Sequence, residues 1–174
     1  MKNLTLIPAI LLSVISVNAL ADNEHQTSVK YNCKTITGTI APLLPDPACN
    51  IKQEQLGHFP DVNFLGFPGT CFKSTLTATL GNIQVTGTSY SGLTANAIND
   101  PAILTAASVI RLNAGSDELG RVFTTDMTLL ANSKENLTMV DGSKIYNGGK
   151  GHLEITGNAL YEQTTFAGTL CSQN

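Results

Sequence analysis

The chain has 174 residues, with 10 Lys and Arg against 13 Asp and Glu and a formal net charge of −3. So few basic residues provide no electrostatic attraction for nucleic acid or for an anionic membrane surface, which excludes both as expected partners. Charged residues form 13% of the chain, about half the usual fraction, and Thr, Ser, Asn and Gly take their place. This composition favours strands and turns over helices.

The first 21 residues predict a secretory signal peptide. Lys2 gives a basic start, residues 4–17 form an apolar run, and residues 19–21 (Ala-Leu-Ala) form a small-x-small cleavage site. Cleavage would leave residues 22–174 as a single domain with nine basic against thirteen acidic residues, a net charge of about −4. No later apolar run approaches the roughly 20 residues of a membrane helix. We therefore expect a secreted or periplasmic protein with no integral membrane segment.

Four cysteines in an exported chain predict two disulfides, and three pairings are open. We favour Cys33–Cys49, which closes a local Pro-rich loop, together with Cys71–Cys171, which ties an early strand to the last one. The chain has no Cys-x-x-Cys motif, and the cysteine spacing does not resemble a zinc ligand set. We therefore expect neither a metal site nor a cofactor.

Residues 34–41 alternate, with Ile36 and Ile40 on one face and Thr on the other, which predicts a half-buried strand. From residue 42 to 70 the alternation stops, because five prolines interrupt a segment that stays apolar. A loop this long is either a flap over an opening or packed irregular structure, and both alternatives stay open. Its aromatic side chains are candidate ligand contacts, namely Phe59, Phe64 and Phe67.

The chain then reads as strands joined by short turns. Residues 72–80 place an apolar face opposite a Thr-rich one, and Gly81-Asn82 predicts a hairpin with residues 83–89. No window after residue 21 sustains a helical apolar stripe. Further strands are expected at 103–112, 119–131 and 137–140, with turns at 114–117 and 132–136.

The last third, residues 140–171, is a Gly-rich turn that precedes two strands and ends at a cysteine. A phosphate-binding loop is excluded here, because such loops open a helix and this turn opens a strand. Short strands at near-regular spacing predict an all-β fold, a single antiparallel β-barrel of about eight strands. Side chains nearly fill a barrel of that size, with room for at most one small ligand.

Residues 140–157 resemble the glycine signature of the allene oxide cyclase-like and dirigent-like small barrels, which share a calycin-like architecture. That signature runs as an apolar residue, Gly-Gly-Thr-Gly, an aromatic residue, then Gly and a strand ending in Gly. Asp141 and Lys144 stand where the family has glycine, and residues 166–171 resemble the end of exported bacterial relatives. The resemblance implies a cofactor-free isomerase or cyclase, or a dirigent-type barrel that forms oligomers. The matching positions are Gly142, Ser143, Tyr146, Gly148, Gly151 and Gly157.

Histidine candidates for chemistry are few. His25 lies in the terminal tail and His58 in the long loop, whereas His152 alternates with Glu154 on a strand face that we interpret as solvated. No Gly-x-Ser-x-Gly or His-Glu-x-x-His motif is present, so serine and metallo-hydrolase chemistry has no anchor.

Three other charged residues are candidates for a binding site. Arg111 and Asp126 each fall in the middle of an expected strand. If both face the lumen, they would form a buried ion pair and mark a polar binding spot; otherwise they face solvent. Glu162 is in phase with Phe166, so it would point inward with a raised pKa unless a bulge turns it outward.

These observations predict an exported, non-catalytic β-barrel that binds a small apolar ligand or a protein partner. The alternatives are the cofactor-free isomerase or cyclase and the dirigent-like oligomeric barrel that the resemblance implies. A homo-oligomer is compatible with each of these functions.

Overall fold

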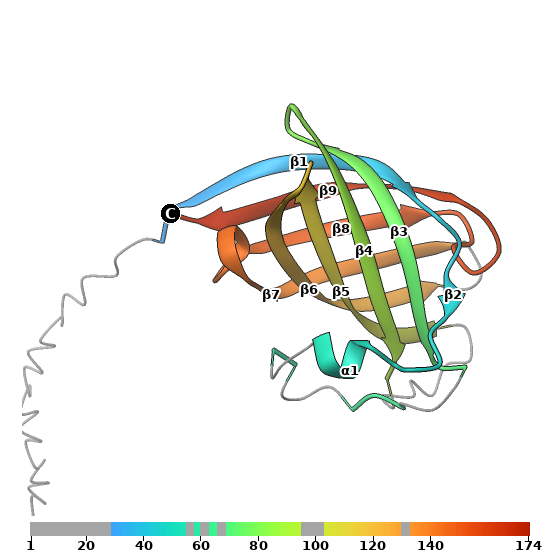
Figure 1. The fold of residues 1–174 in the computed structure, drawn as a ribbon. Coiled ribbons are helices and arrows are strands. Elements are labelled where there is room, and N and C mark those ends of the chain that lie inside the picture. Colours follow the sequence, from blue (N-terminus) through green and yellow to red (C-terminus); the bar gives the residue numbers. More distant parts are fainter. Residues whose placement is uncertain (1–28, 55–57, 60–62, 66–68, 95–102, 130–132) are drawn as a thin grey trace, which may run out of the picture.

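A computed structural model describes residues 29–54, 58–59, 63–65, 69–94, 103–129 and 133–174. The expected signal peptide, His25 and Phe67 lie outside these residues. The described chain is almost entirely β-structure (Figure 1). Its elements are β1 (Tyr31–Ile40), β2 (Leu44–Pro45), α1 (Ile51–Glu54), β3 (Cys71–Leu80), β4 (Ile83–Leu93), β5 (Ile103–Ala114), β6 (Asp117–Leu129), β7 (Lys134–Gly142), η2 (Lys144–Tyr146), β8 (Lys150–Thr156) and β9 (Thr164–Gln173).

The strands form a closed antiparallel barrel, which confirms the predicted fold class. From β3 to β9 each strand pairs with the next in the chain, and β1 closes the barrel by pairing with both β9 and β3. The remaining strand, β2, adds to the edge of β3 beyond the end of β1. The predicted hairpin at Gly81-Asn82 is present, since Leu80 pairs with Ile83 across it. Within the described residues, no helix is long and apolar enough to span a membrane.

Two disulfides are present, but the pairing favoured from the sequence is wrong. Cys33 and Cys171 are direct partners in the β1–β9 ladder and form one disulfide, with a Cα–Cα distance of 3.9 Å. Cys49 and Cys71 form the other, which ties the long loop to the first residue of β3. The ladder register decides the pairing, because it places Cys33 of β1 directly opposite Cys171 of β9.

Inward-facing side chains fill one end of the barrel. Period-two alternation places Ile36 and Ile40 of β1 inward, as predicted, together with the even-numbered positions of β3. Tyr146 of η2 is 2% exposed and closes the end at which the Gly-rich turn lies, and burial raises its pKa to about 12. The apolar side chains that fill this end are Ala78, Leu80, Val85, Met139 and Tyr146.

Glycines near Tyr146 are explained by this close packing. A Cβ atom at Gly142 would overlap the backbone carbonyl oxygen of Tyr146, and one at Gly120, where φ is 149°, would overlap that of Ser143. Only glycine tolerates such approaches without a shift of the backbone. Residues 140–157, which carry the resemblance to the small barrels, therefore help to fill this end of the barrel.

Most described residues of the long loop pack on the outside of the barrel, whereas Leu43 near its start lines the barrel cavity. The loop's side chains meet the outer faces of β5 and β6 in a second buried cluster, which we call the outer cluster. Phe59 contacts Phe123 and Phe64 edge to face, with ring centroids 5.7 and 6.1 Å apart. Of the two alternatives, packed irregular structure describes these residues. The outer cluster comprises Cys49, Ile51, Phe59, Cys71, Ala107, Val109 and Phe123.

Candidate functional site

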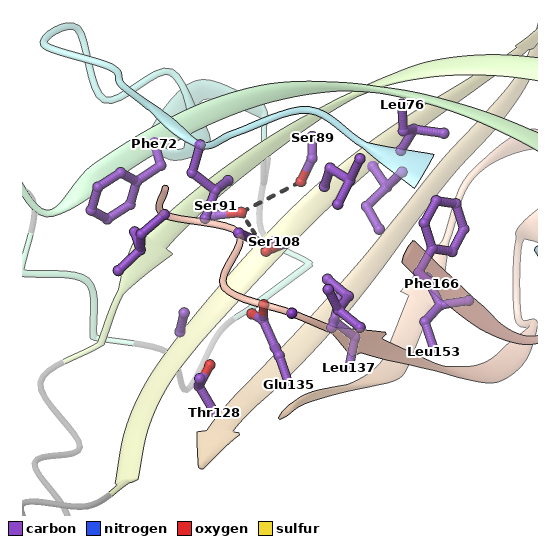
Figure 2. Close-up of a pocket in the computed structure, with 18 of the residues that line it drawn as sticks. Phe72, Leu76, Ser89, Ser91, Ser108, Thr128, Glu135, Leu137, Leu153 and Phe166 are labelled. Atoms are coloured by element: carbon purple, nitrogen blue, oxygen red, sulfur yellow. Dashed lines mark hydrogen bonds between the residues drawn. The ribbon is translucent and has the colours of Figure 1, made fainter. Parts of the chain in front are cut away.

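The barrel encloses a cavity of about 300 Å³ at the end opposite Tyr146. Inward-facing residues from all eight barrel strands line it, and most of them are aliphatic or aromatic (Figure 2). Residues 157–161, which connect β8 to β9, also contribute to the lining. Leu160 and Tyr161 in this connection are 39% and 82% exposed, so the cavity reaches the surface beside them. The apolar wall includes Ile36, Phe72, Leu76, Leu153, Ile155, Phe166 and Leu170.

A row of polar side chains interrupts the apolar lining on one side. Ser89 and Ser91 lie on β4, Ser108 on β5, Asp126 on β6 and Glu135 on β7, so the row crosses four neighbouring strands. We call these five residues the polar wall. Figure 2 shows the three serines linked by hydrogen bonds and the Glu135 carboxyl on the same side of the cavity, away from Leu76 and Phe166.

The hydroxyl groups of the polar wall form a directed hydrogen-bond chain. Ser108 Oγ donates to Asp126 Oδ2, so the Ser91 hydroxyl, 2.7 Å from Ser108 Oγ, donates to Ser108. Ser89 Oγ lies 3.4 Å from Ser91 Oγ and continues the chain. On the other side, Thr124 Oγ1 donates to Asp126 Oδ1 at 2.6 Å. Every dipole therefore has its positive end toward the Asp126 carboxyl, which favours the ionised form of that group.

Burial opposes that ionisation. Asp126 is 3% exposed and lies behind Ser108, and desolvation raises its pKa to about 7, although the hydrogen bonds from Ser108 and Thr124 lower it in part. A carboxyl removed from water resists losing its proton, because the charged form loses more hydration than the neutral form. Asp126 therefore changes its charge close to neutral pH, where an ordinary Asp is fully ionised.

Glu135 is the second carboxyl of the site and contacts the cavity directly. It is half-buried, and desolvation, together with the nearby charge of Asp126, raises its pKa to about 8. Unlike Asp126, its carboxyl has no hydrogen-bond partner among the residues that the structure describes. Two interacting carboxyls that both resist ionisation share about one proton between them at neutral pH. The arrangement can hold or release a proton, or meet a cationic or hydrogen-bonding group of a ligand.

Arg111 faces away from the cavity and from Asp126. Its Nη2 atom lies 2.6 Å from Glu54 Oε2 in α1, and Arg121 Nη1 lies 3.2 Å from the same oxygen. The buried ion pair considered for Arg111 and Asp126 is therefore wrong, because the two side chains lie on opposite faces of the barrel wall. Arg111 instead helps to hold α1 against the outside of the barrel.

The other residues singled out in the sequence lie outside the cavity. Phe59 and Phe64 belong to the outer packing, whereas Glu162 is exposed and accepts a hydrogen bond from the Asn158 backbone N–H at 3.3 Å. His152 is exposed on the outer face of β8, as interpreted from the sequence, and the neighbouring outer residue Glu154 pairs with Lys134 at 3.0 Å.

His58 has a structural environment of its own. Its ring stacks on Phe123 with centroids 3.9 Å apart, and its Nδ1 lies 2.5 Å from Asp141 Oδ2. Burial alone would raise the pKa of Asp141, but hydrogen bonds from His58 and from the Gly142 N–H hold it below its ordinary value. These contacts fasten the long loop to the end of β7.

No group of three or more metal-ligating side chains occurs within the described ranges.

Of the site residues, the sequence reasoning found Asp126 and missed Glu135 and the three serines. Glu135 fell in the turn expected at 132–136, yet β7 already begins at Lys134, which pairs with Leu129 of β6. The alternation Glu135, Leu137, Met139 was the pattern that would have placed it inward. For the serines, the equivalent signal was their common phase with Val85 on β4 and with Ile110 on β5.

Fold and site define the class of protein: a closed eight-stranded antiparallel β-barrel with an internal, mostly apolar cavity that carries two carboxyls. No family model and no curated protein matches the chain. Among solved structures, a pyocyanin demethylase is similar, with 14% identity, a TM-score of 0.41, and coverage of 80% of this chain and 99% of that one. Such a distant likeness carries no argument about the site. The comparisons do not support the expected allene oxide cyclase-like family.

Proposed function

We propose that this protein is an exported barrel that binds one small, largely apolar molecule in its lumen. The observation that carries the proposal is the cavity of about 300 Å³ with its apolar wall. That volume is at the lower end of the range of about 300–1,000 Å³ typical of ligand pockets. An apolar ligand would gain free energy in proportion to the hydrocarbon surface that it removes from water.

Filling the cavity tests this proposal. Ala106 lines the cavity on β5, whereas Ala167 is exposed on the outside of β9, so Ala106→Phe and Ala167→Phe make the same chemical change on opposite faces. Binding of adamantan-1-ol, a compact neutral probe, is measured by isothermal titration calorimetry, and far-UV circular dichroism checks folding. We expect Ala106→Phe to abolish binding and Ala167→Phe to retain it. Wild-type protein that binds no probe, or folded Ala106→Phe that binds as wild type, would overturn the proposal.

The compartment is part of the same proposal. Two disulfides indicate a non-reducing setting, and the first 21 residues have the pattern of a signal peptide. We expect the protein outside the cytoplasm, secreted or periplasmic, with Asp22 as its first residue. Mass spectrometry of protein recovered from the source cells tests this, since an uncleaved N-terminus in the cytoplasm would contradict it.

A cofactor-free isomerase is the second candidate, and the observation that favours it is the carboxyl pair. A carboxyl whose pKa lies near the working pH can both donate and accept a proton during a rearrangement. Glu135 lies where a ligand would contact it, and Asp126 is near enough for its charge to raise the pKa of Glu135. Unsaturated epoxides and β,γ-unsaturated ketones, followed by NMR in D2O, are suitable substrates for the test. Turnover that Glu135→Gln removes would support catalysis, and no turnover on either class would favour binding alone.

The dirigent-like, oligomeric role stays a prediction from the sequence. Its test is equilibrium sedimentation of residues 22–174, in which a monomer at high concentration would contradict it.

A further inference from the structure

The ionisable groups of the cavity are uniformly acidic. Its described lining contains no Lys, Arg or His. Glu135 contacts the lumen directly, whereas Asp126 is hydrogen-bonded to Ser108, whose side chain lines the lumen. The basic groups that the structure pairs with carboxylates are not among the lining residues of the cavity: Arg111 and Arg121 pair with Glu54, His58 with Asp141, Lys134 with Glu154 and Lys144 with Glu118. Nothing described in the barrel interior therefore neutralises the charge of the two carboxyls.

We propose that the cavity selects a small apolar amine in its protonated form, with the ammonium group beside Glu135 and the hydrocarbon body against the apolar wall. This inference rests on the proposed function and specifies its ligand class. Glu135 is suited to the role because it is a carboxyl without a hydrogen-bond partner among the described residues and it faces the space that a ligand would occupy. A cation there would supply the partner that the Glu135 carboxyl lacks.

Competing ligand classes fit the cavity less well. An organic anion would bring a further negative charge next to two acidic groups that already resist ionisation, in a space that screens charge poorly. A neutral alcohol would bury the same hydrocarbon surface and would receive one hydrogen bond, but it would leave the repulsion between Asp126 and Glu135 in place. An ammonium group relieves that repulsion and makes charge-assisted hydrogen bonds, which are stronger than neutral ones.

The geometry also predicts how binding responds to pH. The titratable groups around Glu135 are Asp126 on β6 and Tyr161 in the connection after β8, whereas β8 itself presents Leu153 and Ile155 and strands β4 and β5 present serines. Before binding, Glu135 holds its proton up to about pH 8. A bound ammonium favours the carboxylate, so binding releases a proton below that pH and tightens as the pH rises toward 8.

The experiment compares three probes with one hydrocarbon body, adamantan-1-amine, adamantan-1-ol and adamantane-1-carboxylate. Isothermal titration calorimetry at pH 8 on the disulfide-bonded mature chain gives the three affinities, and a repeat at pH 6.5 in buffers of different ionisation enthalpy measures proton release. We expect the amine to bind at least tenfold more tightly than the alcohol, as charge-assisted hydrogen bonds allow, and the carboxylate to bind most weakly.

Matched variants assign the preference to one residue. Glu135→Gln should remove the preference for the amine while the alcohol binds as before. Glu154→Gln, on the outer face of β8 with its side chain 42% exposed, should keep it. If none of the probes binds, the proposed function fails. If the alcohol binds as tightly as the amine, or Glu135→Gln keeps the preference, the lumen binds ligands but the inferred selectivity for amines is wrong.

Discussion

Replacing Asp126 by Asn should make the protein more stable at pH 8 and leave it almost unchanged at pH 4. In the unfolded chain Asp126 loses its proton near its ordinary pKa of 3.8, whereas in the folded chain it keeps the proton up to about pH 7. Between these values the folded state binds more protons, so the free energy of unfolding falls as the pH rises through this window and levels off above it. Asn has the same shape and never ionises.

The magnitude follows from the two pKa values. Raising the pKa of Asp126 from 3.8 to about 7 corresponds to about 4 kcal/mol of stability lost by pH 8. Asn keeps one acceptor oxygen and adds a donor, so one of the two hydroxyls that now donate to Asp126, Ser108 or Thr124, must rotate to accept. That rearrangement is the same at both pH values. The difference in unfolding free energy between wild type and variant therefore changes from pH 4 to pH 8 only through the charge of Asp126.

Chemical denaturation at pH 4 and pH 8 measures this difference. The chain has no Trp, so far-UV circular dichroism is the suitable probe of unfolding. Asp117→Asn, at an exposed hairpin position, is the matched control and should leave the pH dependence of wild type intact. A variant of Asp126 that loses stability with pH as steeply as wild type would refute the assignment of a buried, reluctant carboxyl to this position.

Two further predictions concern the contacts that hold the barrel and its loop. Replacing Cys33 and Cys171 by Ser should cost more stability than replacing Cys49 and Cys71, roughly 5 against 3 kcal/mol, because the first disulfide spans 138 residues and the second 22; equal midpoints in denaturant would contradict this. Asp141→Asn should destabilise the protein by about 1 kcal/mol at neutral pH, because a neutral amide then replaces the carboxylate that pairs with His58. The pKa of Asp141 lies below its ordinary value, so this contribution is present above that value and is lost as the pH falls through the folded pKa. Hydrogen exchange at residues 58–59 would show the loosened loop, and unchanged protection would argue against this role for the contact.

The alternation of apolar and polar residues predicted most strands of the barrel, because a barrel wall buries one face of each strand and exposes the other. The even-numbered positions of β3 and the Ile pair of β1 face inward as the pattern requires. Alternation fails as a guide in β5, where Ala107 and Val109 on the outer face are as buried as Ser108 and Ile110 on the inner one. The loop covers that outer face, so both phases of the strand are buried. When both faces of a strand are buried, its hydrophobic pattern does not show which residues line the lumen.

Pairing between distant parts of the chain explains the other differences between the sequence predictions and the structure. The start of β7 is set by its neighbours, since Lys134 and Glu135 pair with both β6 and β8, although Ser-Lys-Glu-Asn has the composition of a turn. The disulfide pairing likewise depends on which strands lie side by side, and separation along the chain carries no such information. Tertiary contacts thus determined the position of Glu135 in a strand, and this is one of the cavity residues that the sequence analysis missed.

The loop supports the part of the barrel wall that lies next to the buried carboxyl of Asp126. Asp126 is the kind of group that an apolar side chain would replace at a gain in stability, so its burial needs support from its surroundings. On the outside of the same strands, the outer cluster covers Val109 of β5 and Phe123 of β6, and the Cys49–Cys71 disulfide fixes the loop in place. The covered stretch includes the outer residues on either side of Ser108, namely Ala107 and Val109, whereas Thr125 and Met127, which flank Asp126 on the outer face of β6, are exposed. Phe59 and Phe64, proposed from the sequence as ligand contacts, thus support the strand that carries Ser108, the residue that donates a hydrogen bond to Asp126.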